Sequence, residues 1–142
     1  MYASQQDIED RYGVDALLIV ADDNFDEQVD TDKVNKALSD ATDEINLYVG
    51  KRESLPLTHV PPILKRLAVV IAFYLLSSES GYTEEKRQRY EDAIKVLRSI
   101  AKGEVSLGIA TEPSDDASPV AMEVEVASEE RIFNRNNNNR IF

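Results

Sequence analysis

One segment, residues 63–76, limits the possible folds more than any other, because Lys65 and Arg66 are its only residues that are not apolar. Pro61 and Pro62 come directly before it, and proline suits the first turn of a helix. A helix that is apolar on all sides packs against several neighbours or lies in a subunit interface. Its uninterrupted apolar run, residues 67–76, covers about half of the roughly 20 residues that a membrane-spanning helix needs. We therefore expect the central helix of a bundle and no membrane partner.

The N-terminal residues carry weaker helix signals. Ser4, with Asp7 three residues later, resembles a capping box at the start of a helix that ends near Gly13. Residues 14–21 are mostly apolar and are compatible with a short helix or a strand, of which we favour the helix.

Two longer helices have clear apolar faces. The first begins at Asp30 or Thr31 and runs to about Tyr48, with apolar residues at alternating spacings of four and three: Val34, Leu38, Ala41, Ile45 and Tyr48. Lys51 and Arg52 follow it, and their positive charges are expected to interact favourably with the negative end of its dipole. The central helix is expected to reach about Ser78, with Gly81 ending it, and Thr83 caps a last helix that stops at Gly103. The expected fold is all-α, a small bundle of about four main helices with an extended C-terminal arm.

Composition excludes several classes of site. The chain has 142 residues, no cysteine and one histidine, His59, which excludes disulfides, thiolate catalysis and zinc sites built from cysteine or paired histidines. Its net charge of −11 makes it a poor candidate for wrapping nucleic acid. No signal peptide is visible at the N-terminus, so we expect a soluble intracellular protein.

Charge is distributed unevenly along the chain. Residues 1–30 hold nine acidic residues and one basic residue, whereas residues 31–110 are nearly neutral. Residues 111–130 hold seven acidic residues and no basic one, and residues 131–142 hold three arginines and no acidic residue. Such asymmetry is typical of interaction arms. We therefore divide the chain into a helical domain (1–110), an acidic flexible linker (111–130) and a docking tip (131–142).

The linker and the tip contain the candidate binding residues of the arm. Residues 120–126 alternate apolar and acidic side chains, a strand pattern without a partner strand in the helical domain. The tip repeats Arg-Ile-Phe on both sides of an asparagine run. Apolar anchors and arginines that seek acidic partners make up the predicted binding set: Val120, Met122, Val124, Val126, Arg131, Ile132, Phe133, Arg135, Arg140, Ile141 and Phe142.

No arrangement of residues indicates catalysis, a metal site or a cofactor. Asp22, Asn24 and Asp26 match the first positions of a calcium loop, but Glu27 and Lys33 stand where that loop needs glycine and glutamate. His59 has no spaced partner that would make it a general base. The basic cluster of Lys86, Arg87 and Arg89 lacks interleaved aromatic residues and is best interpreted as a solvated helix face. We expect a protein that is not an enzyme.

A succession of short segments resembles the Mu-like prophage head–tail adaptor proteins. None of the segments is diagnostic alone, and their order carries the resemblance, which covers about residues 1–110 and the last dozen residues. The segments are Met1-Tyr2-Ala3-Ser4, Asp7-Ile8, Arg11-Tyr12-Gly13, Leu55-Pro56-Leu57, Val60-Pro61-Pro62-Ile63-Leu64, Arg66-Leu67-Ala68, Arg89-Tyr90-Glu91-Asp92-Ala93-Ile94, Ile100-Ala101-Lys102-Gly103 and Phe133-Asn134-Arg135.

The resemblance implies a structural virion protein at the head–tail interface, present in the host cytoplasm before assembly. Such a subunit forms a homo-oligomeric ring, a dodecamer, between the portal protein and the next tail-side connector or stopper protein, and genomic DNA passes through it without specific binding. The arm would add a strand to a neighbouring chain. For the contact between subunits we single out residues of the apolar helix and the one that follows: Ile63, Leu67, Val70, Tyr74 and Tyr90.

Two other classes of function remain open. A small helical interaction module could use the arm to capture a partner outside the virion, and a one-to-one complex would favour it. A metal-dependent or nucleic-acid-processing helper could use the acidic loop, which calcium titration or a salt-dependent DNA shift would reveal.

Overall fold

The computed structural model describes residues 1–78 and 81–109. In this part the chain forms helices and no strand, which confirms the expected all-α class. The helices are α1 (Gln5–Tyr12), α2 (Val14–Ala21), α3 (Thr31–Val49), α4 (Pro62–Leu76) and α5 (Glu84–Lys102). Residues 14–21, for which the sequence leaves helix and strand open, therefore form a helix. The segments expected to be the acidic linker and the docking tip lie outside the described residues.

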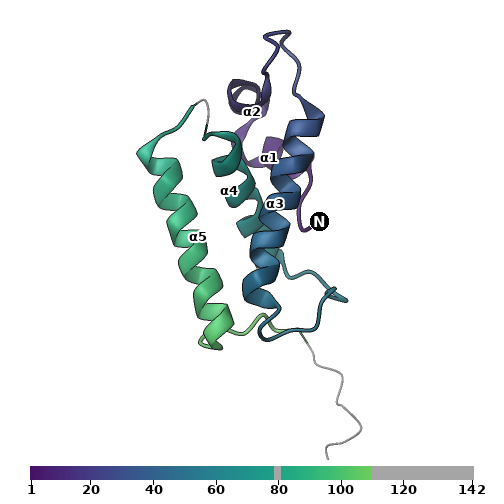
Figure 1. Ribbon diagram of the computed structural model, residues 1–142, viewed down its shortest axis with the longest axis vertical. Coiled ribbons are helices and arrows are strands. Elements are labelled where there is room, and N and C mark those ends of the chain that lie inside the picture. Colours follow the sequence, from purple (N-terminus) through teal and green to yellow (C-terminus); the bar gives the residue numbers. More distant parts are fainter. Residues whose placement is uncertain (79–80, 110–142) are drawn as a thin grey trace, which may run out of the picture. The chain divides into compact units, whose positions relative to one another are not determined.

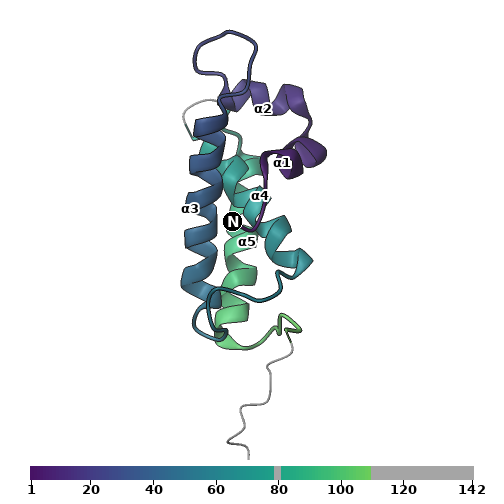
Figure 2. The same ribbon diagram turned by 90° about the vertical axis from the view of Figure 1, so that its right-hand side faces the viewer.

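Helix α4 lies at the centre of the helical body. It contacts each of the other four helices, and α3 and α5 flank it as the long members of the bundle (Figure 1). The short helices α1 and α2 meet at Gly13 and pack against α3 and α4, as the rotated view in Figure 2 shows. Most of α4 is buried on all sides, as its composition predicts: Leu64, Leu67, Ala68, Val69, Val70, Ile71, Ala72, Phe73 and Leu76.

Side-chain caps fix the starts of three helices at the predicted residues. The Ser4 hydroxyl accepts a hydrogen bond from the Asp7 N–H, and the Asp7 carboxylate accepts one from the Ser4 N–H at 2.8 Å, which completes the capping box. The Asp30 carboxylate accepts from two N–H groups in the first turn of α3, and the Thr83 hydroxyl accepts from one in α5. The first turns therefore keep few unsatisfied donors.

Helix α4 ends earlier than the sequence predicts, at Leu76 instead of about Ser78. The buried Ser77 side chain donates its hydroxyl to the carbonyl of Phe73 at 2.7 Å and so satisfies one of the last carbonyls of the helix. Gly81 does not end the helix itself. It lies beyond that end with φ +77°, a conformation that suits glycine.

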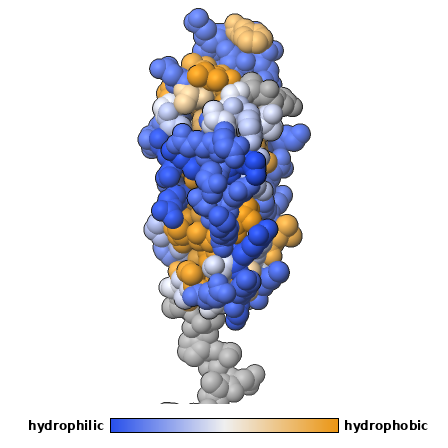
Figure 3. All heavy atoms as spheres, turned by 90° about the vertical axis from the view of Figure 1, so that its left-hand side faces the viewer, coloured by the Kyte–Doolittle hydropathy of each residue, from blue (hydrophilic) through white to orange (hydrophobic). Residues whose placement is uncertain are grey.

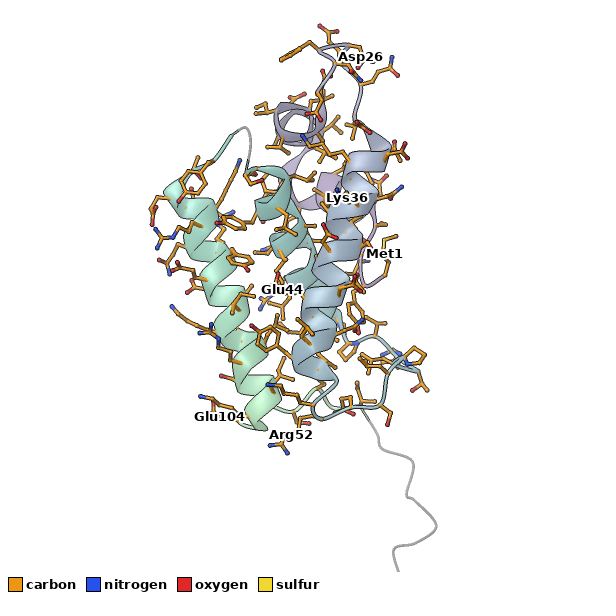
Figure 4. All side chains as sticks on the ribbon, in the orientation of Figure 1. Met1, Asp26, Lys36, Glu44, Arg52 and Glu104 are labelled. Atoms are coloured by element: carbon orange, nitrogen blue, oxygen red, sulfur yellow. The ribbon has the colours of Figure 1, made fainter. Side chains whose placement is uncertain are left out.

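Arg52 also differs from the expectation. Its guanidinium does not interact with the C-terminal end of α3 but donates hydrogen bonds to the carbonyls of Ala101 and Lys102, the last residues of α5. Arg52 lies beside the last turn of α5, so its positive charge meets the negative end of a neighbouring helix dipole (Figure 4). Arg52 thus ties the α3–α4 connector to α5.

Candidate functional site

Helices α1, α4 and α5 enclose a surface groove of about 530 Å³. Its floor is apolar and largely buried, with Leu67 and Val70 from α4 and Ala93 and Val96 from α5. Its rim carries three exposed arginines, one from each helix: Arg11, Arg66 and Arg89. Figure 3 shows the face that α5 covers, where hydrophobic side chains are visible between hydrophilic ones. An apolar floor inside a basic rim suits a segment that carries both apolar and acidic side chains.

Two contacts hold α1 against α4 and so position the rim. The Tyr12 ring stacks on the Phe73 ring with centroids 3.9 Å apart, next to Arg11. Lys65 of α4 forms a 2.6 Å salt bridge with Asp7 of α1. The hydrogen bond from Lys65 is the main reason that the pKa of Asp7 is lowered below its usual value.

The positive charge of the rim arginines is only weakly neutralised by acidic residues of the same chain. In the part of the chain that the structure describes, Arg11 and Arg66 form no salt bridge, and Arg89 pairs with the exposed Glu85 one turn away on α5. An exposed pair of this kind contributes about 0–1 kcal/mol, so it holds Arg89 loosely. Asp92 is the one carboxylate among the described residues lining the groove, and it bonds to Lys95 at 3.1 Å, which lowers its pKa.

A second depression lies between α3 and α5. The Tyr74 and Tyr90 rings stack with centroids 4.3 Å apart, and the Tyr90 hydroxyl donates a hydrogen bond to the Glu44 carboxylate at 2.8 Å. Partial burial, followed by the bond to Glu44, raises the pKa of Tyr90 to about 12. This surface has no basic rim like that of the groove, because Glu44 and Glu91 line it together with Lys95 and Arg98.

The residues predicted to form the contact between subunits therefore do not share one surface. Leu67 and Val70 are buried in the chain's own core and line the groove, whereas Tyr90 lines the second depression and Tyr74 stacks on it. Ile63 is half-buried and packs against the core. Their role in contacts between subunits stays a prediction. The predicted arm residues, from Val120 to Phe142, lie outside the described residues.

The acidic loop between α2 and α3 projects beyond the ends of both helices (Figures 1 and 4, where Asp26 is labelled at its far end). The Asp22 carboxylate accepts hydrogen bonds from the N–H groups of Asp26 at 3.2 Å and Glu27 at 3.0 Å, which organises the loop. Phe25 lies between these residues and is 91% exposed. Lys33 of α3 forms a 2.6 Å salt bridge with Asp23. The loop thus presents an aromatic ring among carboxylates.

Chemical function is not evident in the described residues. Among them, no group of three or more histidine, cysteine or acidic side chains is placed to hold a metal ion, and His59 is exposed on the connector between α3 and α4. In the same part of the chain, none of the helices combines the length and apolar character that crossing a bilayer requires.

Sequence reasoning missed most of the groove. Arg66 carries a usable signal, because it is one of two charged residues in an otherwise apolar helix. Arg11 carries none, since nothing near it in sequence shows that α1 packs beside α4. Phe25 carries a signal as well, because an aromatic residue surrounded by acidic ones in a loop is typical of an exposed side chain.

Comparison with known proteins identifies the family. The family model for Bacteriophage Mu, Gp36 matches residues 2–126. The chain belongs to this Gp36 family. The match continues past α5 into the acidic segment.

Two relatives cover most of the chain. The Mu-like prophage FluMu protein gp36 of Haemophilus influenzae is 37% identical over 123 residues, which are 87% of this chain and 84% of that protein. Gene product J of Escherichia phage Mu is 33% identical over 136 residues, or 94% of each chain. The Gp36-family chain is therefore a phage protein of the Mu type.

Proposed function

We propose that this chain is a structural virion protein, a head–tail connector subunit that forms a ring beneath the portal and conducts DNA from the head to the tail. In this proposal its role is structural and not catalytic, and its partners are the portal protein, further copies of itself and the next tail-side connector or stopper. It acts at the head–tail interface of the virion after synthesis in the host cytoplasm.

The observation that carries the proposal is a helical body with one core, followed in the sequence by a long segment rich in candidate binding residues. The buried apolar residues that the structure describes lie between Ala3 and Ile100 and form one core. The segment after Ile109 carries an alternating apolar–acidic stretch and two Arg-Ile-Phe repeats. A folded body with such an extension is suited to anchoring one ring to another.

Family membership and charge support the same function. Both relatives are proteins of phage Mu or a Mu-like prophage, and the family match includes the alternating stretch up to residue 126. A ring of chains with a net charge of −11 each would repel DNA phosphates, so DNA could pass through without being held.

Co-sedimentation with the portal ring of the same phage tests the proposal. We expect the full chain to bind in ring stoichiometry and a chain ending at Ile109 not to bind. Within the full chain, Phe133→Ala together with Phe142→Ala should weaken binding, whereas Leu47→Ala, at an exposed position on α3, serves as the matched control and should leave it unchanged.

Each other outcome has a definite meaning. If the shortened chain binds as well as the full chain, the helical body makes the portal contact and the anchoring role of the arm is wrong. If neither chain binds, the connector function is overturned, and a helical module that captures a partner outside the virion becomes the better explanation.

A further inference from the structure

The acidic loop and the basic groove are complementary surfaces on one subunit. Residues 22–28 of the loop contain four carboxylates around Phe25, while the described groove lining has three arginines and one carboxylate, Asp92, which is already bonded to Lys95. Opposite charges on two surfaces favour their encounter and suppress contacts of each surface with its own kind.

The apolar parts of the two surfaces also match. Phe25 is 91% exposed at the projecting loop, where no other part of the described chain covers it. The groove has an apolar floor, in which Leu67 and Val70 are buried and Val96 is half-buried. A buried aromatic side chain surrounded by polar contacts is the usual anchor of a protein interface, and the arginines around the floor provide that polar surround.

The two surfaces lie at different places on the body. The loop extends past the ends of α2 and α3 (Figures 1 and 2), whereas the groove is lined by residues of α1, α4 and α5. A contact between two different patches of identical subunits is heterologous, so a bound pair keeps one free groove on one subunit and one free loop on the other for further copies. Repetition of such a contact closes into a ring when the rotation between copies allows it.

We propose that residues 22–28 of one copy dock in the α1–α4–α5 groove of the next copy, with Phe25 on the apolar floor and the loop carboxylates facing Arg11, Arg66 and Arg89. The contact rests on the proposed function in that it supplies the subunit interface of the ring. It assigns the second copy, and not the portal or the arm, as the occupant of the groove.

The absence of cysteine from the sequence allows a direct test by disulfide capture in the full chain. One chain carries Asn24→Cys beside Phe25, and a second carries Val96→Cys in the groove. We expect their mixture to form a mixed disulfide dimer much faster than a mixture in which Leu47→Cys replaces Asn24→Cys. Equal rates for the loop and the Leu47 position would overturn the inference.

Substitutions then test the chemistry of the contact. Phe25→Ala in the loop chain should slow capture by about tenfold or more, the effect of removing a central anchor. Arg66→Glu with Arg89→Glu in the groove chain should slow it as well, and Arg98→Glu at the second depression is the matched control. The rate should also fall with added salt, because the rim is exposed. Insensitivity to both Phe25 and the rim arginines would refute the assignment.

Mixing two defective chains tests the head-to-tail geometry. In sedimentation, a loop variant (Phe25→Ala, Asp26→Lys) and a groove variant (Arg66→Glu, Arg89→Glu) should each be monomeric alone but form a one-to-one dimer together, because one intact loop then meets one intact groove. A mixture that stays monomeric contradicts the inference. If Val124→Lys abolishes capture and Phe25→Ala does not, the C-terminal segment occupies the groove and the assignment is wrong.

The capture and portal-binding experiments can fail independently, so failure of this interface can be distinguished from failure of the proposed function. A chain that binds the portal without loop–groove capture keeps the connector function and loses this interface. A chain that shows capture without portal binding keeps the interface and loses the connector function.

Discussion

Substitution of Gly103 by alanine tests which interactions stabilise the C-terminal end of α5. Gly103 has φ +78° in the left-handed region, and its N–H donates to the Ile100 carbonyl at 3.0 Å. A Cβ atom there would lie 2.6 Å from Cζ of Arg52, which is closer than real Cβ contacts. Because the guanidinium is the far end of a flexible side chain, it would swing away and give up its hydrogen bonds to the last two carbonyls of α5.

The magnitude follows from two separable effects. A left-handed alanine costs about 1 kcal/mol relative to glycine. The exposed contact of Arg52 with the helix C-terminus contributes about 0.5 to 1 kcal/mol. Gly103→Ala should therefore lower the free energy of unfolding by about 2 kcal/mol in the native chain, but by only about 1 kcal/mol in a chain that already carries Arg52→Ala.

Urea denaturation followed by circular dichroism measures all four chains of this cycle. Gly108→Ala is a suitable control, since Gly108 also has positive φ, at +66°, but its added Cβ would meet nothing within 4 Å. An equal cost of Gly103→Ala with and without Arg52 would refute the coupling. A Gly103→Ala chain as stable as the native one would refute the whole account.

Two further predictions concern the core and the stacked tyrosines. Leu64→Ala, at a fully buried position of α4, should lower the free energy of unfolding in urea denaturation by about 2–5 kcal/mol. Leu47→Ala, at a position of α3 that is 72% exposed, should lower it by less than about 0.5 kcal/mol. Similar losses for the two variants would mean that α4 is not the centre of the core. The pKa of Tyr90 is raised from 10.0 to about 12, so its stabilising contribution is complete below pH 10 and is lost as the pH rises through about 12. In an alkaline titration followed by tyrosinate absorbance, the native chain should show a step near pH 12 that the Tyr90→Phe chain lacks. If the missing step lies near pH 10 instead, burial and the hydrogen bond to Glu44 do not raise the pKa of Tyr90.

The helices were predictable where local chemistry determines them. Ser4, Asp30 and Thr83 cap the helices expected from the sequence, and the position of α4 followed from its apolar composition. Residues 14–21 were ambiguous because eight mostly apolar residues suit either a strand or a buried helix. Packing decides for the helix, since Leu17, Val20 and Ala21 share the face that is buried against the rest of the body.

The groove was not predictable in the same way. Arg11, Arg66 and Arg89 belong to three helices, and no local signal reports that helix packing brings them to one rim. The same packing separates Leu67 from Tyr74, although both lie on α4 and sequence reasoning grouped them. Helix packing sets which faces meet, and it depends on the side chains of all the contacting helices at once.

The central position of α4 has a consequence for how a subunit can respond during assembly. Because α4 touches each of the other four helices, moving any one of them away would expose apolar surface that the core now buries. We therefore expect the helices to move as a single rigid body when the subunit meets its partners. Within the described residues, adjustment to a neighbour then falls to the loop at residues 22–28, since Val29 and, in the connector after α3, Leu57 already pack against the core.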